Sequence, residues 1–203
     1  MIKSFRAFRR AAALFVAILA LTLQGNTAFA KNEPKSGFIS EFLGQLDRVK
    51  GQVVSLEDAV PQDKFNWRPM EGVRSISEVY LHIADANYLF ANFAGLKAPL
   101  DNKTLMDEKT RDARTTDKAK IAEALNASFD WTKSAVAKLT EADLNKQVEF
   151  FGMKTTVRNL LMTCLNHTHE HLGQSIAYAR SNGVVPPWTA KEQEEMKKAA
   201  QKK

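Results

Sequence analysis

Apolar residues recur at helical spacing in four segments of the chain. In the first segment, residues three or four positions apart form one stripe. Its members are Phe42, Leu46, Val49, Val53, Leu56 and Val60. Pro61 ends this helix. A polar connection over 61–74 follows, and the second helix begins with a capping box, in which Ser75 and Glu78 satisfy free backbone N–H groups.

The second half of the chain predicts two further helices. The third begins near 115–117 and carries apolar residues at helical spacing up to Leu139. The fourth runs from about Thr155 to Ser181 and stops before Gly183, a candidate left-handed cap, and two prolines. The polar stretch 95–115 is expected to be a long crossing loop. Residues 148–153, VEFFGM, are consistent with either a short turn or a strand pair.

Four amphipathic helices without a run at strand period predict an all-α fold, a four-helix bundle with long inter-helix connections. Because two connections are long, the helices need not alternate up and down. The bundle is assigned to residues 31–188. Residues 189–203 form a short, charged, helix-prone tail that we expect to be peripheral.

The first 30 residues have the pattern of a secretory signal peptide. A basic start, MIKSFRAFRR, precedes the apolar run AAALFVAILALTL, and NTAFA offers a cleavage site after Ala30. An uncleaved anchor would need a longer run, since a spanning helix takes about 20 apolar residues. The sequence therefore predicts a periplasmic or secreted protein, without a stable membrane anchor after cleavage.

Removal of this segment changes the charge of the chain. The full chain has 29 Lys+Arg and 23 Asp+Glu, and residues 1–30 contain four basic residues and no acidic one, so 25 against 23 remain, near +2. This balance gives no reason to expect a nucleic-acid partner. Cys164 is the single cysteine, so an intramolecular disulfide is excluded.

The four histidines occupy only two of the predicted helices. His167, His169 and His171 lie in NHTHEHLGQ, and His82 lies in the second helix. Residues four apart share a helix face, so His167 and His171 can converge on one ion, whereas His169 is turned away by about 200°. His82 is the natural third ligand if the two helices pack together. A His-x-x-x-His pair is also common by chance, and His82 alone could be a hydrogen-bonded core residue.

Four short motifs together carry a family resemblance. They are Trp-Arg-Pro at 67–69, Ser-Ile at 75–76 before His82, His-x-x-x-His-x-Gly-Gln at 167–174, and Tyr-x-Arg-x-x-Gly-x-x-Pro-Pro at 178–187. Over most of residues 38–188 the chain resembles the DinB/YfiT-like family of metalloenzymes, the DinB superfamily. The resemblance implies a bundle that can form a homodimer and a divalent metal, zinc or nickel, bound by His82, His167 and His171. Leu172 departs from the family, where arginine is common, which concerns substrate contacts more than metal binding.

Three neutral imidazoles leave a bound metal ion with open coordination positions, which is the catalytic pattern. Such an ion can lower the pKa of bound water to about 7, or bind a thiolate as a nucleophile. Because low-molecular-weight thiols are mainly cytosolic, export favours water. The expectation is an exported metal-dependent enzyme, hydrolytic, with a small-molecule substrate. A thiol-dependent S-transferase is the less favoured alternative.

Four other residues are candidates for supporting roles. Asp85, Asn166 and Gln174 could orient imidazoles or substrate, or could simply be solvated polar residues. Cys164 could be a fourth ligand that closes the site, although a small buried core residue is the simpler interpretation. The sequence identifies no general base. This keeps two other functions open: a non-catalytic metal-binding or stress-related protein, and a metal-free bundle that binds a small apolar ligand.

Overall fold

The computed structural model describes residues 37–201, so the predicted signal peptide lies outside the described residues. The four long helices are α2 (Phe38–Ala59), α3 (Ile76–Phe93), α6 (Lys118–Val136) and α8 (Val157–Ser181). The shorter elements are η2 (Gln62–Lys64), α4 (Asn102–Leu105), α5 (Glu108–Asp112), α7 (Glu141–Leu144), β1 (Gln147–Phe150), β2 (Met153–Thr156) and α9 (Pro187–Ala200). The predicted all-α bundle is confirmed.

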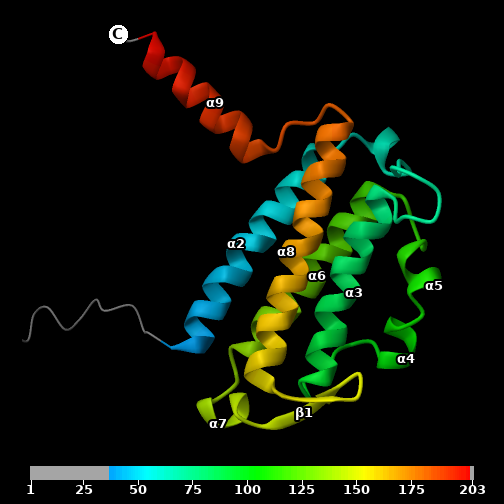
Figure 1. Ribbon diagram of the computed structural model, residues 1–203, viewed down its shortest axis with the longest axis vertical. Helices are drawn as coiled ribbons and strands as arrows, with labels where there is room; N and C mark the ends of the chain where they lie inside the picture. Colours follow the sequence, from blue (N-terminus) through cyan, green and yellow to red (C-terminus); the bar gives the residue numbers. More distant parts are fainter. Residues whose placement is uncertain (1–36, 202–203) are drawn as a thin grey trace, which may run out of the picture. The chain divides into compact units, whose positions relative to one another are not determined.

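The four long helices form the bundle shown in Figure 1. α3 packs against α6 and α8, and α2 packs against the same two helices, so α2 and α3 lie diagonally opposite each other. α2 and α8 run in one direction, while α3 and α6 run in the other (Figure 1). Two successive long helices, α3 and α6, are therefore parallel, and the chain between them must cross the length of the bundle.

The predicted apolar stripes form the core. All six residues of the first stripe, five in α2 and Val60 directly after it, are at most 2% exposed. The predicted capping box of α3 is present as well, because Ser75 Oγ accepts a hydrogen bond from the Glu78 N–H and the Glu78 carboxylate accepts one from the Ser75 N–H. These local signals fix where α3 begins and which face it buries, and thereby the direction in which His82 points.

The crossing between α3 and α6 is not the plain loop that the polar composition predicts. It contains α4 and α5, which lie along α3 (Figure 1). The Asp101 side chain caps α4, and α5 is fastened to α3 by ion pairs from Arg111 and Arg114 to Asp85. A segment held by polar contacts has no apolar periodicity, so the pattern that predicts the long helices does not detect it.

Residues 147–156 form the strand pair that the sequence left open. β1 and β2 are antiparallel, with Phe150 opposite Met153, so only Phe151 and Gly152 form the turn. Both have positive φ, 48° and 80°. Two-residue turns of this kind match the twist of a hairpin.

The end of α8 and the start of α9 follow the sequence signals. Gly183 has φ of 76°, as expected for a left-handed cap. α9 begins at Pro187, two residues before the predicted boundary of the tail, because a proline in the first turn loses no helical hydrogen bond. No residue of α9 is buried. Within residues 37–201, no helix is long and apolar enough to span a membrane.

Candidate metal site

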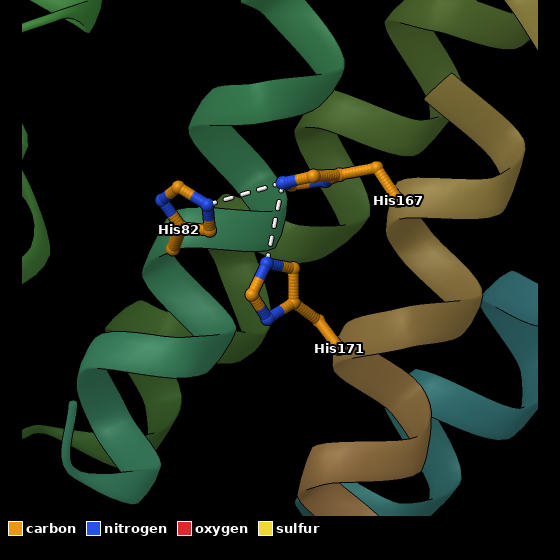
Figure 2. A group of neighbouring side chains, drawn as sticks. All are labelled: His82, His167 and His171. Atoms are coloured by element: carbon orange, nitrogen blue, oxygen red, sulfur yellow. Dashed lines mark hydrogen bonds between the residues drawn. The ribbon is translucent and has the colours of Figure 1, made fainter. Parts of the chain in front are cut away.

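Three histidines from α3 and α8 meet at one point. His82 comes from α3, and His167 and His171 lie one turn apart on α8 (Figure 2). The Nε2 atom of His167 is 3.2 Å from Nε2 of His82 and 3.2 Å from Nε2 of His171. The three residues that the spacing selected are thus brought together by the packing of α3 on α8.

The outer nitrogens of two rings each face an acceptor oxygen, and the hydrogen bond of His171 fixes its tautomer. Nδ1 of His171 donates to Oε1 of Gln174 at 2.8 Å, and the amide of Gln174 donates in turn to the Tyr178 hydroxyl. Nδ1 of His82 faces Oδ2 of Asp112 at 3.6 Å, and a carboxylate favours a hydrogen on that nitrogen. His171 therefore directs its Nε2 lone pair at His167, and the carboxylate near His82 favours the same arrangement there.

This arrangement leaves a lone pair without a partner unless a cation joins the cluster. Nε2 of His167 carries at most one hydrogen, which serves only one of the two lone pairs aimed at it. A single ion between the rings satisfies all three nitrogens. The spacing also fits, because zinc–nitrogen bonds of 2.0–2.1 Å in a tetrahedron place neighbouring nitrogens about 3.3 Å apart. The residues present thus suit a divalent transition metal.

Two of the three rings, those of His167 and His171, have a lowered pKa, and metal binding requires the neutral form. Burial lowers the pKa of His167 to about 3, and the neighbouring His171, His82 and Arg74 act in the same direction. Burial also lowers the pKa of His171, against the opposing effect of its hydrogen bond to Gln174. At pH 7 both imidazoles therefore offer a lone pair without first having to release a proton.

Comparison with known proteins agrees with this geometry. The sequence profile of the DinB superfamily matches residues 45–175. The chain belongs to the DinB superfamily. Among curated proteins it is similar to the uncharacterized protein YjoA of Bacillus subtilis, with 29% identity over 133 residues, which cover 63% of this chain and 80% of YjoA.

Solved structures support the fold of this DinB-superfamily chain. A DinB-like protein from Bacillus cereus matches with a TM-score of 0.63 and 23% identity, over 72% of this chain and 93% of that one. YfiT from Bacillus subtilis matches with a TM-score of 0.59 and 16% identity, over 76% and 93%. YfiT is described as a probable metal-dependent hydrolase with an unusual four-helix bundle topology. At these identities the likeness establishes the fold alone.

The other residues singled out in the sequence have different positions. Gln174 orients the imidazole of His171, which is the first of the two roles considered for it, the other being a solvated polar residue. Asn166 is exposed and lines the cavity beside His167. Asp85 also lines that cavity, but its carboxylate is taken up by Arg111 and Arg114. It therefore anchors α5 and does not contact an imidazole through any described hydrogen bond.

Cys164 and His169 lie apart from the three imidazoles. The Cys164 thiol is buried 3.9 Å from the Asn87 side chain, and burial raises its pKa to about 12. Among the described residues, it does not join the ligand atoms that lie within 4.8 Å of one another. The geometry therefore favours the core interpretation of Cys164. His169 is exposed, with Nδ1 bonded to the Leu165 carbonyl, as its helical position predicts.

Two carboxylates of α5 were missed in the sequence. Asp112 is 6% exposed and accepts a hydrogen bond from Nε of Arg74 at 2.6 Å, while Glu108 pairs with the same guanidinium at 2.5 Å. Oxygens of both lie within 4.8 Å of a His82 ring nitrogen. Burial opposes ionisation of Asp112, but the contacts with His82 and Arg74 outweigh it and lower the pKa of that carboxyl. Asp112 thus stays charged and holds His82 in position.

Proposed function

We propose that this DinB-superfamily protein is a metal-dependent hydrolase with a small-molecule substrate. The observation that carries the proposal is the convergence of three Nε2 atoms, one of them with its lone pair fixed by a hydrogen bond on the far side of the ring, beside an open cavity. A divalent ion held by His82, His167 and His171 would supply Lewis acidity and activate water. Imidazole ligands suit zinc and nickel, which are the ions we propose.

The surrounding residues support this chemistry. Gln174 and Asp112 keep two imidazoles in the tautomer that binds metal, which is the usual task of residues behind the ligands. Glu170 lines the same cavity, forms none of the described ion pairs and is the carboxylate we propose to accept a proton from water, whereas Glu108 is paired with Arg74. Cys164 lies outside the ligand group, so a coordination position remains for water or substrate.

We also propose that the protein acts in the periplasm or outside the cell. The support is the first 30 residues, in which a basic segment, a short apolar run and a small-residue cleavage site follow one another. A compartment poor in low-molecular-weight thiols favours hydrolysis over thiol transfer.

Removal of two ligands should abolish metal binding. Untagged protein starting at residue 31 is expected to contain about one zinc or nickel ion per chain by elemental analysis, and the His167→Ala, His171→Ala double variant none. His169→Ala is the matched control, because it removes an exposed histidine from the same helix. Circular dichroism verifies that each variant is helical. Equal metal content in all three proteins would refute the three-histidine site.

The same preparations test catalysis. Metal-loaded protein and His169→Ala are expected to hydrolyse activated carboxylic esters such as p-nitrophenyl acetate faster than the double variant does. If metal is bound at full stoichiometry but a panel of esters, amides and lactones is not cleaved faster than by the double variant, the hydrolase proposal fails. The bundle would then be a metal-binding protein without this activity.

A further inference from the structure

A cavity of about 450 Å³ opens beside the histidine cluster. His82 and His167 are among its lining residues. One part of its wall is apolar and comes from α3, α4 and the β1–β2 hairpin: Ala86, Leu89, Phe90, Leu105, Phe150 and Phe151. Binding pockets commonly combine such an apolar wall with a few polar groups that fix orientation.

Aromatic rings connect the histidines to the hairpin. The Phe90 ring lies 5.4 Å from the His167 ring, and the Phe150 ring lies 5.2 Å from Phe90. Phe151 continues the row at 4.6 Å from Phe150. A ligand whose polar end reaches His167 would therefore lie against aromatic surface along its length.

The last ring of the row is placed where local structure disfavours it. Phe151 is the first residue of the two-residue turn, with φ of 48°, and is 57% exposed. Asn, Asp or Gly is strongly preferred at this position, because only these residues adopt positive φ readily. An exposed aromatic residue that lines a cavity in a disfavoured backbone conformation is a candidate for a functional role.

The charges of the cavity exclude one large class of ligands. Carboxylates line it at Asp85, Glu108, Asp112 and Glu170, and none of its lining residues that the structure describes is a lysine or arginine. The guanidinium groups beside the cavity are already paired with its carboxylates: Arg74 with Glu108 and Asp112, and Arg111 and Arg114 with Asp85. Phosphate groups in proteins are bound chiefly by arginine, lysine or helix N-termini, and the side chains here do not provide such cations.

We infer that this cavity binds a small molecule that carries no anionic group and has an aromatic or branched apolar group. That group lies against Phe90, Phe150 and Phe151, and the polar end faces His167 and Asn166. Phosphorylated molecules are excluded by the carboxylates. The assignment of the polar end as the reacting group rests on the proposed hydrolase function, whereas the binding itself does not.

Binding is measured with two naphthyl probes that differ in charge. N-(1-naphthylmethyl)acetamide is neutral, and 1-naphthyl phosphate is a dianion. Isothermal titration uses wild-type protein freed of metal and kept in excess EDTA, so that no metal ion attracts phosphate and His167 remains in place. The neutral probe is expected to bind about tenfold more tightly or better. Equal or tighter binding of the phosphate would overturn the inference, and hydrolytic activity does not enter this comparison.

Phe151→Asn in the same metal-free protein locates the probe. Asparagine adopts positive φ more readily than phenylalanine, so the melting temperature is expected to stay equal or rise. The neutral probe is expected to bind about fivefold to tenfold more weakly, because apolar contact area is lost. Met153→Gln is the matched control, since Met153 is exposed in the same hairpin but does not line the cavity. Unchanged binding in Phe151→Asn, or an equal loss in Met153→Gln, would contradict the assignment.

Discussion

Replacing Asp85 with alanine is expected to destabilise the protein by about 2–4 kcal/mol, because it removes the shared partner of two partly buried cations. The carboxylate is 5% exposed and accepts hydrogen bonds from both Arg111 and Arg114 at 2.8–3.2 Å. Without it, two guanidinium groups lie side by side without a counter-charge. α5 should then detach from α3, carrying Glu108 and Asp112 away from His82.

The effect is measured by urea unfolding and by hydrogen exchange of residues 102–114. Asp130→Ala provides the matched control, because Asp130 also forms an ion pair, with Lys50, but its side chain is 64% exposed. Exposed pairs contribute about 0–1 kcal/mol, so this variant should remain close to the wild type. Equal destabilisation of the two variants, or unchanged exchange over 102–114, would show that the Asp85 pairs do not hold α5.

The contrast between these helices explains what the sequence could predict. α2, α3, α6 and α8 are long and amphipathic, so a local pattern is enough to assign them and their buried faces. α4 and α5 have four and five residues. The segment of α5 is held to α3 through Asp85, which lies 26 positions before Arg111 and 29 positions before Arg114. No local pattern contains that information.

The same distinction applies to the site. His167 and His171 were predictable because four residues bring two side chains onto one helix face, and Gln174 lies within reach of His171 for the same reason. Cys164 is three residues before His167 and therefore only about 60° from it around the helix, so the spacing alone left its role open. The packed structure places the thiol in the core beside Asn87. Asp112 lies near His82 in space but 30 positions after it in the sequence, so only the packed structure identifies it.

A buried ionisable carboxyl group, that of Glu57, should make the stability of the protein depend on pH. Glu57 in α2 is 1% exposed, and among the described residues its Oε1 atom has no hydrogen-bond partner. Burial raises its pKa from 4.5 to about 7, against the attraction of Lys118. Because the proton is bound more tightly in the folded than in the unfolded chain, Glu57 stabilises the fold fully below about pH 4.5 and loses that contribution as the pH rises through 7.

Glu57→Gln removes this titration and should make the protein more stable in alkali. The shift corresponds to about 3 kcal/mol at most, and relaxation around the charge reduces it, so we expect a gain of about 1–3 kcal/mol over wild type near pH 8. Near pH 5, where the wild-type carboxyl is mostly protonated, the two proteins should differ little. Urea unfolding at both pH values gives the free energy of unfolding of each protein. The stability gain of Glu57→Gln over wild type is then compared between about pH 8 and about pH 5, and the effects of other titrating groups cancel because both proteins contain them.

Asp58→Asn is the control for this experiment, because Asp58 is the neighbour of Glu57 in α2 but its side chain is 84% exposed. Its replacement should change stability by about 0.5 kcal/mol or less at either pH. If Glu57→Gln shifts the unfolding free energy by the same amount at both pH values, the wild-type carboxyl does not titrate between them in the folded protein. A stability gain confined to the higher pH would show that ionisation of the buried Glu57 carboxyl destabilises the folded protein.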